Sequence, residues 1–142
     1  MIKNIIIGKN SSITRYLCKY LKNTQVFSAN QLNKTYLNKN TKSLKRINII
    51  FNNFYSSKNL NTLNEKNYRK FCELSLEKLF LILEGIPSSK INKIIYTSSS
   101  SIYRIPENLN NQSKDSFNRE LYSSFKLAAE KLITNYANKK KV

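Results

Sequence analysis

The chain has 142 residues, which allows one domain with a single modest core and leaves no clear room for a second. Its 25 Lys and Arg against 8 Asp and Glu give a formal charge of +17. Nearly all of this charge is Lys, scattered among many Asn and Ile, which is typical of a compositional bias and disfavours nucleic acid as a dedicated partner. No His occurs and Cys18 lies far from Cys72, which excludes a Cys/His zinc site and favours a reduced, cytoplasmic protein.

Neither a signal peptide nor a membrane span is expected. The apolar run Ile5–Ile7 is too short for the first, and Leu79–Leu83 is far too short for the second. We therefore expect no metal and no membrane among the partners of this protein.

The first third of the chain predicts a strand, a helix and a second strand. The β-branched run Ile2–Ile7 ends at Gly8, as a buried parallel strand would. Ser11 or Ser12 can cap the following helix, and a second strand is expected at Gln25–Ser28. One face of the predicted helix is apolar and consists of Ile13, Tyr16, Leu17, Tyr20 and Leu21.

The rest of the chain continues the alternation of strands and helices. Residues 29–46 are polar and predict a loop or a weak helix, followed by a strand at Ile47–Phe51. A long helix is expected from about Glu65 to Gly85, a fourth strand at Lys93–Thr97 and a last helix over roughly Arg119–Ala137.

This alternation predicts a Rossmann-like three-layer α/β fold with a short, mostly parallel sheet, formed by residues 1–138 and followed by a frayed basic tail at 139–142. Right-handed crossovers bring the carboxyl ends of parallel strands to one edge, where ligands bind. Gly8, Asn52–Asn53 and Ser98–Ser99 follow three of the strands. The sequence therefore predicts a site at this edge.

Three segments resemble a known family. Ile94–Tyr103 is similar to a strand with a catalytic serine, Tyr122-x-x-x-Lys126 followed by Ala128–Leu132 is similar to a catalytic helix, and Ile5–Thr14 is similar to an opening strand and phosphate turn. Together they resemble the N-terminal part of an extended short-chain dehydrogenase/reductase of the NAD-dependent epimerase/dehydratase family, which acts on nucleotide sugars. The spacing alone has little weight, because Tyr136 and Lys140 repeat it.

The resemblance implies a cofactor, NAD or NADP, and a small-molecule substrate such as a nucleotide sugar. It implies catalytic roles for Ser99 (or Ser98, if the register slips by one), Tyr122 and Lys126. We expect the Lys126 ammonium, one helical turn from Tyr122, to lower the pKa of the phenol. The cofactor-binding residues it implies are Gly8, Ser11, Ser12, Ile13, Asn53 and Lys126.

Several features depart from the family pattern. Ser11 and Thr14 replace glycines of the phosphate turn, and no carboxylate follows the second strand, so NAD and NADP remain equal alternatives. Ser75 lies near a supporting Asn of the family, and no C-terminal substrate lobe follows the last helix. A catalytically silent nucleotide-binding relative or fragment with a regulatory or assembly role is therefore the alternative, and a homodimer is open.

Two simpler interpretations concern the candidate residues themselves. Tyr122 can be a half-buried packing residue with a solvated Lys126 beside it, and the serine run Ser98–Ser101 can be a hydrophilic exit from a strand. Both alternatives stay open at the level of sequence.

Overall fold

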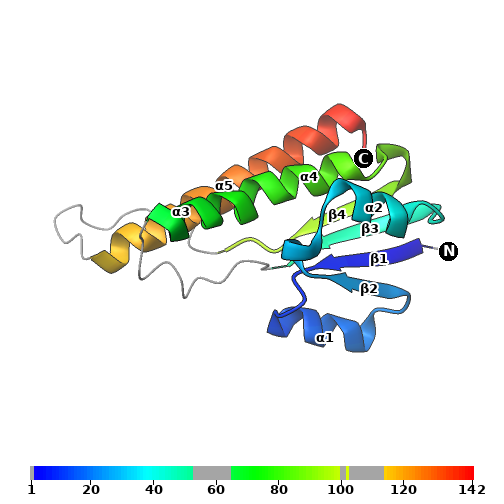
Figure 1. The fold of residues 1–142 in the computed structure, drawn as a ribbon, viewed down its shortest axis with the longest axis horizontal. Coiled ribbons are helices and arrows are strands. Elements are labelled where there is room, and N and C mark those ends of the chain that lie inside the picture. The colour runs from blue at the N-terminus through cyan, green and yellow to red at the C-terminus, as the bar shows by residue number, and fades with distance from the viewer. Residues whose placement is uncertain (1, 53–64, 100–101, 103–113) are drawn as a thin grey trace.

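The computed structural model describes residues 2–52, 65–99, 102 and 114–142. Within these ranges four strands form one all-parallel sheet in the order β2-β1-β3-β4 (Figure 1). The strands are β1 (Ile2–Ile7), β2 (Thr24–Phe27), β3 (Arg46–Phe51) and β4 (Ile91–Tyr96). The α/β fold with a short parallel sheet is thus confirmed, and each strand begins within two residues of its predicted start.

The helices and helical turns are α1 (Ser12–Tyr20), η1 (Ala29–Gln31), α2 (Lys34–Thr41), α3 (Glu65–Cys72), η3 (Glu73–Glu77), α4 (Lys78–Gly85), η4 (Ser88–Lys90) and α5 (Lys114–Lys140). The weak helix considered for the polar connection forms as α2, because the side chain of Asn33 accepts a hydrogen bond from the Tyr36 amide at 2.8 Å and so caps its first turn. The last helix begins earlier than predicted, and Lys139 and Lys140, expected in a frayed tail, continue it.

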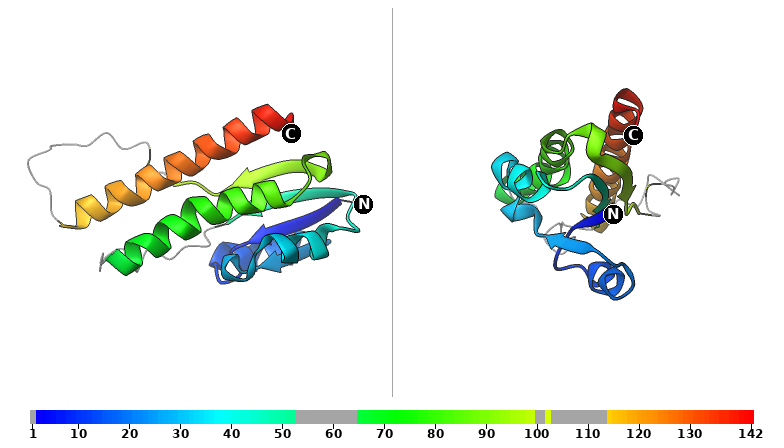
Figure 2. Two further views of the ribbon diagram at one scale, coloured as in Figure 1. Left: turned by 45° about the horizontal axis from the view of Figure 1, so that its top comes forward. Right: turned by 90° about the vertical axis from the view of Figure 1, so that its right-hand side faces the viewer.

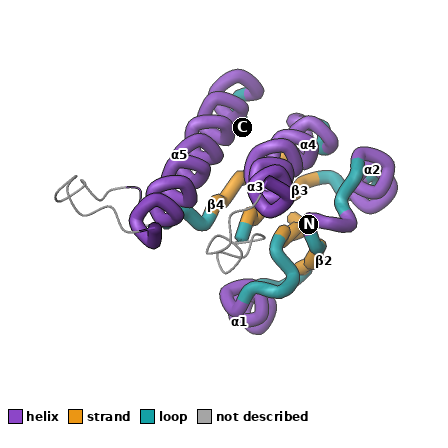
Figure 3. Tube along the Cα trace, turned by 60° about the vertical axis from the view of Figure 1, so that its left-hand side comes forward, coloured by secondary structure: helices purple, strands orange, loops and turns teal. Residues whose placement is uncertain are grey.

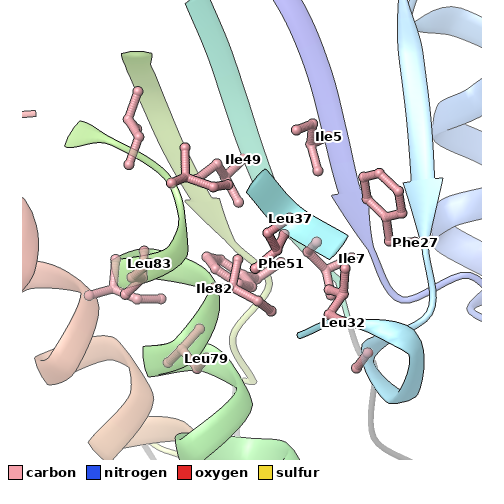
Figure 4. Close-up of a cluster of buried hydrophobic side chains, with 14 of the residues drawn as sticks. Ile5, Ile7, Phe27, Leu32, Leu37, Ile49, Phe51, Leu79, Ile82 and Leu83 are labelled. Carbon is pink, nitrogen blue, oxygen red and sulfur yellow. The ribbon is translucent and has the colours of Figure 1, made fainter. Parts of the chain in front are cut away.

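Helices lie on both faces of the sheet, and one face carries more of the described helices than the other. In the described ranges α2, α4 and α5 lie on one side and α1 on the other (Figures 2 and 3). The main core lies under the first group, where Ile7 and Phe51 point toward Leu79 and Ile82 of α4 (Figure 4). Each such fully buried side chain stabilises the fold by roughly 1.5–3 kcal/mol. This core holds the carboxyl ends of β1 and β3 in place.

The apolar face predicted for the helix after β1 is only partly buried, because Leu17 and Leu21 are half-buried and its other three members are exposed. Ile13, Tyr16 and Tyr20 are 46%, 60% and 67% exposed, whereas Thr14 faces inward. The physical reason is the short sheet, since no other described helix shares this face with α1. Ile95 of β4, whose side chain is 47% exposed, belongs to the same poorly covered side.

The long helix before β4 is interrupted by a π-helical turn. Leu74 and Leu83 are both buried although they are nine residues apart, a spacing of about two and a half turns that would put them on opposite sides of a regular α-helix. The wide turn η3 inserts an extra residue and brings both side chains to the core. Ser75 lies within this turn, half-buried.

Candidate functional site at the carboxyl ends of the strands

The turn after β1 depends on Gly8, whose φ of 121° lies in the region that favours glycine. Its amide donates to the Phe27 carbonyl at 3.0 Å, and its carbonyl accepts from the Ser11 amide at 3.1 Å. The chain then enters α1 at Ser12 with no acidic residue in the first turn. Because the first amides of a helix lack partners within it, the N-terminus of α1 is suited to an anion.

A buried amide, Asn52, connects this turn to the end of β3. Asn52 is 0% exposed, and its Nδ2 donates to Ser11 Oγ at 3.2 Å and to Thr14 Oγ1 at 2.8 Å. Its backbone amide donates to the Ile7 carbonyl at 2.9 Å. The Ser11 hydroxyl, which accepts from Asn52, can donate its own proton to a ligand.

Thr14 connects the first turn of α1 to the turn after β1. It is buried, and its hydroxyl donates to the Gly8 carbonyl at 2.7 Å while accepting from Asn52. The side chain therefore fills the space between helix and strand that a glycine would leave bare.

The same network reaches the end of β4. The Thr97 amide donates to the Phe51 carbonyl at 3.0 Å, and the Thr97 hydroxyl lies 3.2 Å from Asn52 Oδ1 and 3.3 Å from the Phe51 oxygen. Three strand ends are thus joined by hydrogen bonds through one carboxamide. This edge includes the topological switch point between β1 and β3, where the strand order reverses; ligands bind at such points in open α/β sheets.

Lys126 of α5 contacts this edge. Its Nζ donates to the Thr97 carbonyl at 2.9 Å and lies 4.9 Å from the centre of the Tyr96 ring and 5.6 Å from that of Tyr122. Lys126 is therefore not the solvated side chain of the simpler interpretation. Tyr122, Lys126 and the beginning of the serine run are brought together, with Ser99 half-buried and Ser98 exposed.

Other candidate residues have different positions. Asn53 lies outside the described residues, and Ser12 and Ile13 begin α1 with exposed side chains. Tyr136, of the second Tyr-x-x-x-Lys pair, is buried and donates to the Leu83 carbonyl at 2.8 Å, so this pair is structural. The sequence did not predict that Asn52 and Thr97 form the centre of the hydrogen-bond network. A signal was present for both residues, because each is a polar residue that directly follows an apolar strand.

Burial determines the protonation of the aromatic and amine groups here. It raises the pKa of Tyr122 and, with smaller contributions from Tyr122 and Glu130, raises that of Tyr96. Burial lowers the pKa of Lys126, against an opposing effect of Glu130. The expected lowering of the Tyr122 pKa is therefore wrong, because desolvation dominates and Nζ lies over the ring and bonds to a backbone carbonyl. Tyr122 is a protonated phenol at neutral pH.

These pKa shifts predict a loss of stability in alkali. Tyr96, Tyr122 and Tyr136 have raised folded-state pKa values, so their contribution is complete below pH 10.0 and is lost as pH rises through the folded-state values. Lys126 has a lowered pKa, so its contribution to the free energy of unfolding rises with pH instead of falling. This is one group against three tyrosines, and the net change is a loss of stability. We expect the free energy of unfolding in urea to fall as pH rises above about 10, from the unfolded-state pKa of tyrosine toward the raised folded-state values. The fall should be smaller in Tyr96→Phe, and an equal fall in both proteins would contradict the assignment.

The fold and the hydrogen bonds define the class of this domain: a doubly wound parallel α/β domain with a polar cluster at its topological switch point. Comparison with protein-family models, curated proteins and solved structures gives no significant match to the chain. Among the described residues, no three His, Cys, Asp or Glu side chains gather as metal ligands. No helix in the described ranges combines the length and apolar character that crossing a membrane requires.

Proposed function

We propose that this chain is the dinucleotide-binding part of an NAD(P)-dependent epimerase/dehydratase or reductase acting on a nucleotide sugar or a related carbonyl or hydroxyl substrate. The observation that carries the proposal is the hydrogen bond from Lys126 Nζ to the Thr97 carbonyl. It joins the Tyr-Lys helix to the strand edge that also holds the Gly8 turn, as a nicotinamide enzyme of this kind requires.

The residues at the turn fit a dinucleotide. Gly8 permits a tight turn, Ser11 offers a hydroxyl, and the first amides of α1 at Ser12 and Ile13 suit the pyrophosphate. The ammonium of Lys126 has three donors and uses one on Thr97, which leaves others for the nicotinamide ribose. NAD(P), when bound, would supply the hydride chemistry.

The chain's own groups suit the proton transfer. A protonated Tyr122 can donate to the oxygen of a carbonyl substrate as that oxygen gains negative charge, with Ser99 as the hydrogen-bonding partner of the same oxygen. The raised pKa of Tyr122 keeps the proton on the phenol at neutral pH. Tyr122 and Ser99 therefore favour reduction of a carbonyl substrate over oxidation of a hydroxyl substrate at this pH.

The alternative is a nucleotide-binding domain without turnover. The observation that favours it is also the position of Lys126, which faces two aromatic rings and a backbone carbonyl and leaves the pKa of Tyr122 raised. Such a domain would bind the cofactor as a regulatory or assembly element. Both candidate functions predict that the chain binds the cofactor, and only the first predicts that it converts a substrate.

Titration with NADH and with NADPH, followed by nicotinamide fluorescence, tests the binding step. We expect saturable binding of at least one cofactor and a loss of about tenfold in affinity for Gly8→Ala, since a side chain is strained by about 1–2 kcal/mol at positive φ. Gly85→Ala is the matched control, because the three atoms nearest to its new Cβ all belong to the side chain of Leu37, the closest being the movable Cδ1 at 2.9 Å. No binding of either cofactor, or equal affinity in Gly8→Ala, would contradict the proposal.

A further inference from the structure

The exposed surface of α1 carries two parallel rows of side chains. Tyr16 and Tyr20 are one helical turn apart, with ring centroids 4.8 Å from each other and planes inclined at 46°. Arg15 and Lys19, also one turn apart and exposed, form a neighbouring row. The helix therefore presents an aromatic row beside a cationic row of the same length.

Among the described residues, no Asp or Glu belongs to α1 or to the strands β1 and β2. The first 64 residues contain no Asp or Glu, and all eight acidic residues follow, at Glu65, Glu73, Glu77, Glu84, Glu107, Asp115, Glu120 and Glu130. Those in the described ranges belong to α3, η3, α4 and α5, and α4 and α5 lie on the opposite face of the sheet (Figure 3). Lys9 and Lys22 add exposed cations near the two ends of α1. Within the described ranges, the positive charge of α1 therefore has no acidic residue on the same helix or on β1 and β2.

The poorly covered sheet surface beside α1 is polar at its centre. Asn48 Nδ2 donates to Asn4 Oδ1 at 2.9 Å, and Asn92 Nδ2 donates to Asn48 Oδ1 at 2.8 Å, which forms a row of carboxamides across β1, β3 and β4. An apolar protein surface would have to desolvate this row. A second copy of the chain would bring the Arg15 and Lys19 rows together, so like charges would repel.

We propose that the α1 surface binds single-stranded nucleic acid, with bases stacked on Tyr16 and Tyr20 and phosphates contacting Arg15 and Lys19. Unpaired bases expose the π-faces that tyrosines bind, and a cationic row beside an aromatic row follows backbone and bases together. This surface consists of exposed side chains of α1, whereas the proposed cofactor site uses the Gly8 turn, the backbone amides of the first turn of α1 and Lys126. Binding at the α1 side chains does not require nicotinamide to be bound.

The test is fluorescence anisotropy of labelled oligomers of about 12 deoxythymidines or 12 uridines, which distinguish DNA from RNA. We expect Tyr16→Ala/Tyr20→Ala to weaken binding by about tenfold or more. For Arg15→Gln/Lys19→Gln we expect the slope of log affinity against log salt to become shallower by about 1.4, because each neutralised phosphate of a single strand contributes about 0.7. Circular dichroism should show the wild-type fold in both, since all four side chains are exposed.

Matched controls separate this site from general attraction to a basic protein. Lys139→Gln/Lys140→Gln removes two exposed charges from the end of α5, and Phe80→Ala removes an exposed aromatic ring from α4. Both should bind the oligomers as the wild type does. Equal losses in controls and α1 variants, no binding at all, or equally effective competition by an acidic polypeptide such as polyglutamate would overturn the proposal.

Discussion

Replacing Tyr122 by Phe should reduce turnover by about 10²–10⁴-fold while nicotinamide affinity stays unchanged. The substitution removes only the hydroxyl that would give a proton to the substrate oxygen, and it keeps the ring that lies 5.6 Å from Lys126 Nζ. The measurement is the rate at which the absorbance of bound reduced nicotinamide is lost with a panel of nucleotide sugars and simpler carbonyl compounds. Cofactor fluorescence in the same samples reports binding independently.

Tyr136→Phe is the control for this experiment. Tyr136 belongs to the second Tyr-x-x-x-Lys pair, and its hydroxyl bonds to the Leu83 carbonyl in the core. Its loss should cost about 1 kcal/mol of stability and leave turnover intact. Wild-type turnover in Tyr122→Phe would remove this residue from the mechanism. Cofactor binding without turnover in the wild-type protein would support the alternative function, a nucleotide-binding domain that lacks catalytic activity.

Replacing Asn52 by Ala should destabilise the protein by about 2–4 kcal/mol. The carboxamide is fully buried and bonds to the hydroxyls of Ser11 and Thr14, and its loss leaves buried polar groups with fewer partners. Urea unfolding measures the change. Asn38→Ala, at an exposed position of α2, is the matched control and should change stability by less than about 0.5 kcal/mol.

Asn52→Asp distinguishes hydrogen bonding from packing. The carboxylate has nearly the same shape, but it cannot donate to Ser11 or Thr14 and introduces a buried charge. We therefore expect destabilisation at neutral pH that is partly relieved in acid, where the protonated group can donate one bond. Wild-type stability in both Asn52 variants would show that the network does not hold the strand ends together.

The strands were predictable because each is a short β-branched run that ends at a polar residue or glycine. Ile2–Ile7 was predicted with both ends correct, and the other strands with errors of one or two residues. Helix α2 was only weakly predictable, since its stability depends on Asn33 as a cap and on the burial of Leu37 against α4. Tertiary contacts of this kind are invisible in local composition.

The candidate site was predictable in position and less so in chemistry. Its edge follows from parallel strands, and the contact of Lys126 with the end of β4 agrees with the order of strand, serines and helix. The protonation of Tyr122 could not be read from the spacing, because a pKa depends on burial and on where the ammonium points. The exposure of Tyr16 and Tyr20 was also unpredictable, since an amphipathic pattern does not state whether a covering layer is present.

The π-helical turn η3 divides a continuous helix into parts of different local stability. Carboxyl-terminal to it, α4 is held by Leu79, Ile82 and Leu83 in the core. In α3, among the side chains that the structure describes, the buried one is Phe71, which packs edge-to-face on Phe125 of α5 with ring centroids 4.6 Å apart. Opening of a helix costs least where few apolar contacts must be broken. We therefore expect the first part of the helix to fray as far as the wide turn before the sheet is disturbed, with η3 as the boundary between two units of different local stability.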